Sequence, residues 1–155
     1  MKSVLSWTTM AVLAVCFLGP APIQAWFGSK YTTLTPDKGV LFIPVKDVSD
    51  GKAHYFSARS DKGIDVKFFV VKSRDGVIRA AVDACDVCYR SGKGYVQEDH
   101  VMTCTNCGMR FATDRINEVK GGCNPAPLNR MVKDDTLVIT MAAINDNAWY
   151  CEFKK

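Results

Sequence analysis

The sequence predicts a mainly β, antiparallel domain from residue 40 to residue 155, and two observations support this fold class. Short apolar runs recur from Val40 onward, several of them alternating with period two, and turn residues such as Asp50-Gly51 separate them. Arg74-Asp75-Gly76 has the composition of a tight hairpin turn between two of these runs. We find no amphipathic helical pattern of convincing length, so the hydrophobic core is expected to lie between strands.

The expected strands follow one another along the chain. Ile64–Val71 is apolar on nearly every second position and is expected to enter the core, and Val77–Val82 is expected to return beside it. The turn Lys133-Asp134-Asp135 precedes the last strand. The runs expected to form strands are Val40–Val45, Lys52–Ala58, Ile64–Val71, Val77–Val82, Tyr95–Thr103, Met109–Ala112 and Leu137–Ile144.

Residues 1–25 have the layout of an export signal. Lys2 supplies a positive charge, Met10–Leu18 is apolar, and Ala25 is the small residue that a signal peptidase requires. The apolar run is too short to span a membrane comfortably, although an uncleaved N-terminal anchor stays open. We therefore expect an exported protein, with residues 26–39 as a polar linker before the β domain.

The charge pattern and the absence of catalytic motifs narrow the function classes. The formal net charge is +4, and the charged residues are scattered without a basic run, which argues against nucleic-acid binding. No Ser/His/Asp arrangement, paired-carboxylate signature or phosphate loop stands out, and no small-molecule substrate is evident. Whether the chain is an enzyme stays open, with a carrier or metal-binding protein favoured.

Two Cys-x-x-Cys pairs carry the strongest chemical signal. Cys85 and Cys88 form the first pair, and Cys104 and Cys107 form the second. A hairpin between the pairs can bring four thiolates into one tetrahedral shell, which suits zinc, Cu(I) or an iron–sulfur centre. Six of the seven cysteines follow the export signal, so disulfides or redox dithiols are the alternative. A bridge within either pair would close a small, strained loop, which favours metal binding.

The remaining cysteines and the two histidines are weaker candidates. Cys123 follows Gly121-Gly122, which lets the backbone approach the site, so it is a candidate fifth ligand, a neighbouring thiol or a partner for Cys151. Cys151 is otherwise expected to be a buried small hydrophobe. His54 is expected to be structural or exposed, and His100 is a weak candidate for a peripheral ligand.

The order of hairpins and ligand loops resembles that of a Rieske domain. In Rieske centres two loops hold a two-iron cluster, and two histidines bind one of the irons. Here Cys88 and Cys107 stand where those histidines are expected, and Asn124–Leu128 resembles the proline loop that covers a Rieske cluster. The resemblance implies an antiparallel β domain with both Cys-x-x-Cys loops at one end.

A longer resemblance covers nearly the whole chain after the export signal. The motifs that carry it are Asp83–Tyr89, Gly92–Tyr95, Cys104–Phe111 and Gly121–Pro127. They are similar to those of the FtrD-like family, bacterial iron–sulfur proteins that are exported or membrane-attached and often encoded beside ferrous-iron permeases. This resemblance implies an iron–sulfur cofactor and a location in the periplasm or on the periplasmic face of the inner membrane. It also implies an inner-membrane iron permease, or another redox partner.

The type of export signal leaves the identity of the metal open. A folded protein that carries a cluster crosses the membrane on a twin-arginine signal, and residues 1–25 contain no arginine. A single Fe, Zn or Cu ion in the same four-cysteine site is therefore the alternative cofactor. We expect an electron carrier accessory to iron uptake. The alternatives are a non-redox protein that binds or delivers zinc or copper, and a thiol–disulfide redox protein.

Overall fold

Three small β-sheets make up the fold of residues 29–152, the part of the chain that the computed structural model describes. The first sheet has the order β1-β3-β4-β5, the second β2-β10-β9, and the third β6-β7-β8. Every neighbouring pair is antiparallel except β1–β3, which is parallel. The mainly β, antiparallel fold class predicted from the sequence is confirmed.

The elements have the following bounds. The strands are β1 (Thr32–Leu34), β2 (Val40–Pro44), β3 (His54–Arg59), β4 (Asp65–Lys72), β5 (Ile78–Val82), β6 (Tyr95–Glu98), β7 (Val101–Cys104), β8 (Arg110–Ala112), β9 (Met131–Lys133) and β10 (Thr136–Thr140). The helical elements are α1 (Met141–Asp146) and the 3₁₀ turns η1 (Val45–Val48), η2 (Tyr89–Ser91), η3 (Thr113–Arg115) and η4 (Ala148–Cys151).

Strand β4 separates two hydrophobic cores. Phe68 and Val70 face the larger core, which lies against the second sheet and α1, whereas Phe69 and Val71 face a smaller core against the third sheet. All four side chains are fully buried. A strand that is covered on both faces needs apolar residues at consecutive positions, which explains the Phe-Phe-Val-Val run in β4.

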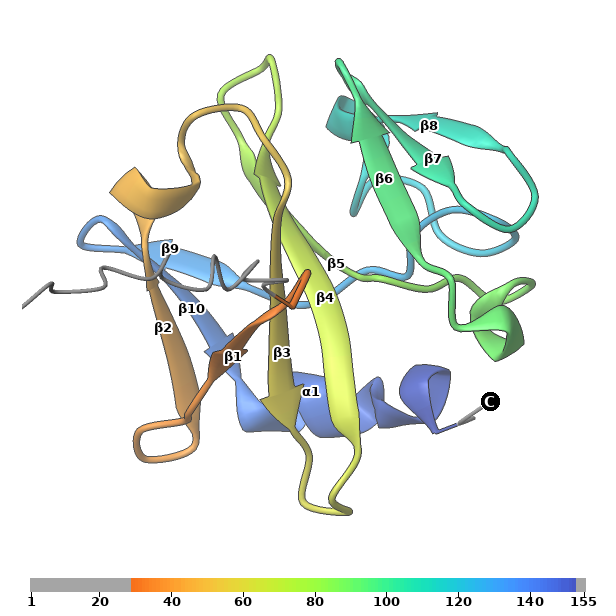
Figure 1. Ribbon diagram of the computed structural model, residues 1–155. Coiled ribbons are helices and arrows are strands. Elements are labelled where there is room, and N and C mark those ends of the chain that lie inside the picture. The colour runs from red at the N-terminus through yellow and green to blue at the C-terminus, as the bar shows by residue number, and fades with distance from the viewer. Residues whose placement is uncertain (1–28, 153–155) are drawn as a thin grey trace, which may run out of the picture.

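The third sheet and the three cysteine-bearing loops lie at one end of the molecule, on the right of Figure 1. The smaller core joins this sheet to β4 through Tyr95 and Met102, which are buried, and it includes Cys85 and Cys104. The site is therefore built on the seam between the first and third sheets. This is the arrangement expected from the order of strands and Cys-x-x-Cys pairs.

The last strand predicted from the sequence is longer than the strand observed there. Leu137–Ile144 was expected to be extended, but β10 ends at Thr140 and the chain turns into α1. The Thr140 side chain accepts a hydrogen bond from the Ala143 N–H at 3.2 Å, which caps the helix. The Met-Ala-Ala run that follows consists of good helix formers, and α1 buries Met141 and Ile144 against the larger core.

Two strands lie where the sequence pattern showed none. Residues 26–39 were assigned to a linker, but Thr32–Leu34 forms β1 and pairs with β3 from Thr32↔Phe56 to Leu34↔Ala58. Met131–Lys133 forms β9, opposite β10 across the turn at Asp134 and Asp135. Both strands have three residues, too few for a period of two to be visible. The predicted export signal, residues 1–25, lies outside the described residues.

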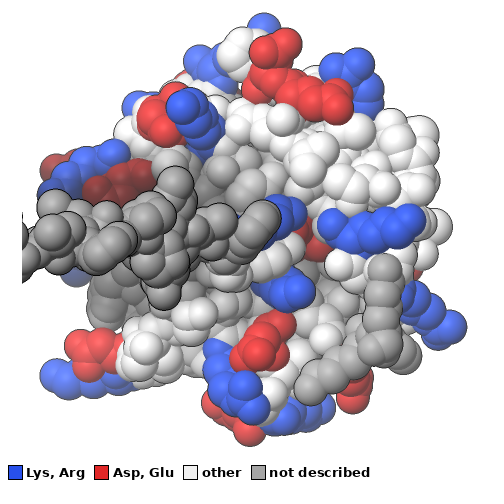
Figure 2. Space-filling view, in the orientation of Figure 1, with Lys and Arg blue, Asp and Glu red and all other residues white. Residues whose placement is uncertain are grey.

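Charged side chains are dispersed over the surface. Figure 2 shows Lys and Arg interspersed with Asp and Glu on the face it presents, so neither sign forms a large patch there. Within residues 29–152, no helix has the length and apolar composition required to cross a membrane.

Candidate metal centre

The first ligand loop begins with a buried carboxylate that fixes its position. Asp83 follows β5 directly, and its side chain has no exposed surface. The carboxylate accepts hydrogen bonds from the Tyr95 N–H at 2.7 Å, the Tyr31 hydroxyl at 2.6 Å and the Lys30 ammonium at 2.7 Å. These bonds join the N-terminal segment, the end of β5 and the start of β6 at a point two residues before Cys85 in the chain.

Cys85 and Cys88 occupy one tight turn after this carboxylate. The Tyr89 N–H donates to the Cys85 carbonyl at 3.1 Å and closes the turn. The Cys88 N–H donates to the Cys85 Sγ at 3.2 Å. Cys85 is fully buried and Cys88 is half-buried, so the loop presents one thiol to the interior and one toward the surface.

The second ligand loop is a matching turn between β7 and β8. The Gly108 N–H donates to the Cys104 carbonyl at 2.8 Å, and Gly108 has φ +73°, which a residue with a Cβ rarely adopts. Cys104 is buried and Cys107 is exposed. The Thr105 N–H donates to the Gly94 carbonyl at 3.0 Å, which ties this loop to the segment that follows the first loop.

A third loop brings Cys123 to the same place. Gly121 and Gly122 both have positive φ, at 86° and 63°, and turn the backbone toward the site. The Tyr95 hydroxyl donates to the Cys123 carbonyl at 2.5 Å. Pro125-Ala126 then runs beside the first loop, where the Ala126 N–H donates to the Ala84 carbonyl at 2.9 Å.

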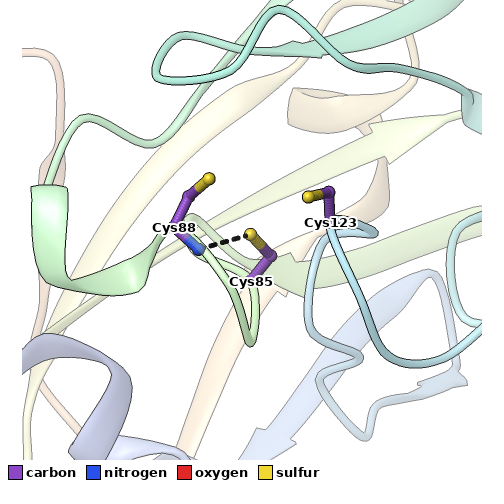
Figure 3. A group of neighbouring side chains, drawn as sticks. All are labelled: Cys85, Cys88 and Cys123. Atoms are coloured by element: carbon purple, nitrogen blue, oxygen red, sulfur yellow. Dashed lines mark hydrogen bonds between the residues drawn. The ribbon is translucent and has the colours of Figure 1, made fainter.

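Five thiols gather in two overlapping groups. The Sγ atoms of Cys85, Cys88 and Cys123 lie within 4.8 Å of one another, and so do those of Cys88, Cys104 and Cys107. We call these the first and second sulfur triads; Cys88 belongs to both. Figure 3 shows the first triad, in which Cys123 points its sulfur toward the first loop from a separate segment. The structure thus brings together all four predicted ligands and the fifth candidate.

Hydrogen bonds, burial and neighbouring thiols shift the pKa values of Cys88 and Cys107. The Asn106 side-chain amide donates to the Cys88 Sγ at 3.4 Å and acts to lower the Cys88 pKa, but burial and the neighbouring thiols raise this pKa to about 12. The Met109 N–H lowers the pKa of the exposed Cys107 thiol. Cysteine binds a metal as the thiolate, so metal binding would displace thiol protons at this site.

Other candidates named from the sequence lie apart from the sulfur triads. The Cys151 Sγ accepts the Lys67 N–H at 3.4 Å, and this thiol packs against the larger core rather than pairing with Cys123. His54 contacts Asp50 at 2.7 Å, and His100 lies at the β6–β7 hairpin. Neither histidine belongs to a potential ligand group among the described residues. The six cysteines of residues 29–152 are all free.

Two residues of the site gave no signal in the sequence, and a third was seen there only as part of a motif. Lys30 and Tyr31 lie in the segment assigned to a linker, more than fifty positions before the carboxylate that they contact. The Lys30 ammonium also donates to the Tyr95 carbonyl at 2.9 Å. Tyr95 itself belongs to a motif that resembles the FtrD-like family, but only the fold shows that it holds the Cys123 loop.

Part of the chain matches the model of a known protein family. Residues 48–150 match the model of a family described as membrane iron-sulfur containing protein FtrD-like. The match includes all three ligand loops and every strand from β3 to β10. None of the curated proteins compared with this chain matches it.

Two solved structures are similar to part of the chain. Both are of the quaternary ammonium Rieske monooxygenase CntA, one in complex with the inhibitor MMV12 and one in the apo form. They are 15% and 16% identical to this chain with a TM-score of 0.43, and each alignment covers 62% of it. The matched region covers 29% and 30% of the two CntA chains, so this chain spans less than a third of their length.

Proposed function

We propose a function from one premise: this chain belongs to the FtrD-like family of membrane iron-sulfur containing proteins, whose model matches residues 48–150. It is a metal-binding protein of the iron–sulfur type. Our proposal is that it is exported and transfers electrons at the metal centre in support of iron uptake. The thiols of Cys85, Cys88, Cys104 and Cys107 hold the centre.

The donor set fits such a cofactor. Within the described residues, the potential ligand groups consist of cysteine alone, and iron–sulfur clusters are held by cysteine thiolates. Two donors already point at sulfur, the Cys88 N–H on Cys85 and the Asn106 amide on Cys88. Such hydrogen bonds stabilise negative charge on sulfur and set the reduction potential of a bound centre. When bound, the cluster would supply one-electron redox chemistry.

The observation that carries the proposal is the graded exposure of the thiols. Cys85 and Cys104 are buried, whereas Cys88 is half-buried and Cys107 is exposed. The side chains beside the outer thiols are apolar and open to solvent: Val87 is 64% exposed and Met109 is 53% exposed. A redox partner can therefore approach the outer edge of the site closely, while the inner edge is held by the core.

The space around the site favours a carrier over an enzyme. The cavity beside the ligand loops, lined by Cys85, Cys88 and Tyr95 among others, has a volume of about 10 Å³. This is room for about one water molecule. A substrate would have to bind outside this cavity, whereas electron transfer needs only close approach. A rigid thiolate site also limits the structural change that accompanies a change in charge.

The role in iron uptake and the location are the further parts of the proposal. The FtrD-like resemblance implies a partner in the inner membrane, an iron permease or another redox protein. The export signal expected in residues 1–25 would put the domain on the periplasmic side of that membrane. With residues 1–25 as an anchor or a cleaved leader, the β domain would meet its partner outside the cytoplasm.

The test is to isolate the protein without oxygen and measure iron, acid-labile sulfide and visible absorption, followed by voltammetry. We expect iron and sulfide in equal amounts, a coloured protein and a reversible one-electron wave. A loaded protein without a reversible wave would reject electron transfer and leave metal binding standing. A colourless protein that contains zinc or copper would favour the non-redox alternative instead.

A further inference from the structure

The turn η4, near the end of the chain, lies against the first ligand loop. In Figure 1 it is the last blue turn before the C-terminus, and it contacts η2, the turn that follows Cys88. Tyr150 of η4 and Tyr89 of η2 pack against the same small buried cluster, which includes Ala84, the residue before Cys85. The last turn of the described chain therefore supports the loop that carries the first two candidate ligands.

Three aromatic rings join these two turns. The rings of Trp149 and Tyr150 are stacked, with their centroids 3.7 Å apart. The Tyr89 ring meets both of them edge-on, at centroid distances of 5.1 Å from Trp149 and 6.0 Å from Tyr150. Stacked and edge-on contacts of this kind stabilise aromatic pairs. They hold the Tyr150 ring, so its hydroxyl has a fixed position relative to the first ligand loop.

The Tyr150 hydroxyl donates a hydrogen bond to the carboxylate of Asp86, which lies between the two cysteines of the first pair. A hydrogen bond to an ionised acceptor is stronger than one between neutral groups. Burial and the Asp86 carboxylate raise the pKa of Tyr150, so the hydroxyl keeps its proton and stays a donor. The other carboxylate oxygen faces the third loop, because a Cβ on Gly121 would lie 3.7 Å from the Asp86 Oδ2. The carboxylate is therefore held between η4 and the loop that carries Cys123.

We propose that Tyr150 is a positioning residue of the metal centre: its hydroxyl fixes the Asp86 carboxylate, and thereby the turn that presents Cys85 and Cys88. The inference rests on the proposed function, because it takes these two thiols as ligands of that centre. The bonds from the Cys88 N–H to the Cys85 Sγ and from the Tyr89 N–H to the Cys85 carbonyl are internal to the turn. Tyr150 ties the turn to another element, and groups that orient metal ligands in this way help to retain the metal.

The test follows the loss of the centre from the loaded full chain in the presence of a chelator, by visible absorption. Tyr150→Phe keeps the ring and its stacking and removes only the hydroxyl. We expect it to lose the centre about tenfold faster than wild type, since groups that support metal ligands change metal affinity by that order. Asp86→Ala should do the same. The double variant should be no faster than either single variant, because both remove the same bond.

Two further variants separate the hydrogen bond from other effects. Asp86→Asn keeps an oxygen that accepts the Tyr150 hydroxyl, so we expect it to retain the centre as wild type does. Tyr55→Phe removes a hydroxyl that donates to the Tyr95 carbonyl at 3.1 Å, and it should leave the rate unchanged. A folded Tyr150→Phe or Asp86→Ala that keeps the centre as long as wild type would overturn the inference. So would an Asp86→Asn that loses it as fast as Asp86→Ala.

A second measurement needs no bound centre. In reduced, metal-free protein, we expect iodoacetamide to alkylate Cys85 faster in Tyr150→Phe than in wild type, because a loosened turn exposes this buried thiol. Cys104, the buried thiol of the second pair, is the internal control and should react at the same rate in both proteins. Peptide-level mass spectrometry measures both sites in one sample.

The two measurements separate this inference from the proposed function. Equal alkylation of Cys85 in Tyr150→Phe and wild type would overturn the inference and leave the proposed function intact. Faster alkylation of Cys85 in a protein that binds no iron would reject the proposed function, and it would support the role of Tyr150 in placing the turn.

Discussion

Cys104 is the buried member of the second Cys-x-x-Cys pair. It therefore offers the clearest test of how much a bound metal stabilises the fold. We expect Cys104→Ser to lose the metal. The accompanying loss of unfolding free energy should be about 4 kcal/mol when the free metal exceeds its dissociation constant a thousandfold. Metal analysis and urea unfolding of loaded protein measure both effects.

Cys151→Ser is the matched control for this change. It removes a thiol that accepts the Lys67 N–H and packs beside the larger core. Metal content should be unchanged and the loss of stability small. Equal losses of stability in both variants, without metal dependence, would indicate that the cysteines serve packing or disulfide formation.

Gly94 is required for the buried carboxylate under the first loop. It has φ +70°, and a Cβ there would lie 2.4 Å from the Asp83 Oδ2. We expect Gly94→Ala to lower the free energy of unfolding by about 2–4 kcal/mol, because backbone strain adds to displaced hydrogen bonds. Gly92→Ala is the control, since Gly92 has φ +61° with open space around it and should lose only about 1–2 kcal/mol. Urea unfolding compares them, and equal losses would contradict this role.

At the scale of single elements, the sequence predicted strands where alternation or apolar runs were long enough. β4 and β5 are found within one residue of their expected limits, because each contains a run of buried apolar residues, Phe68–Val71 in β4 and Ala80–Val82 in β5. β1 was not predicted, since Thr32–Leu34 has no apolar pattern and depends on β3 for pairing. The ligand loops were predicted because cysteine spacing is visible in the sequence. The contact of Lys30 with Asp83 was not predicted, because these residues are far apart in the sequence and only the fold brings them together.

Asp75 in the turn between β4 and β5 forms a charge pair with Arg79 of β5, and this pair makes stability depend on pH. Arg79 is buried and donates to the Asp75 carboxylate at 2.8 Å and to the Ser73 hydroxyl at 2.5 Å. The hydrogen bond from Arg79 is the main cause that lowers the pKa of Asp75 from 3.8 to about 2. A carboxyl whose pKa is lowered by folding stabilises the fold above its ordinary pKa, and this stabilisation is lost as the pH falls through the folded value.

We therefore expect Asp75→Asn to unfold at a lower temperature than wild type at pH 6. The difference should shrink between about pH 4 and pH 2, where the wild-type carboxyl gains its proton. Melting curves of metal-free protein at several pH values measure this without competition between protons and metal. Asp65→Asn is the control, because Asp65 pairs with the exposed Arg59 and should change stability little. A difference that persists unchanged at pH 2 would contradict the assignment to this carboxyl.

At the scale of the whole molecule, the fold has two hydrophobic cores, and only one of them contains cysteines of the site. The larger core lies between the first and second sheets and α1, and it contains none of the five site cysteines. The smaller core joins β4 to the third sheet and includes Cys85 and Cys104 among its buried residues. The metal would therefore clamp the third sheet to the rest of the domain, across the seam that the smaller core fills.

This division predicts that metal removal loosens one part of the molecule only. On chelation, we expect the backbone amides of β6, β7 and β8 to exchange with deuterium at least tenfold faster, because the clamp on the smaller core is lost. The amides of β2 and β10, which pair side by side in the second sheet from Thr136↔Pro44 to Thr140↔Val40, should keep their protection. Hydrogen–deuterium exchange with peptide-level mass spectrometry compares the loaded and chelated protein. Equal acceleration in all three sheets would show that the domain unfolds as one unit and that the site is not a local clamp. No acceleration in the third sheet would show that its packing against Phe69 and Val71 holds it without metal.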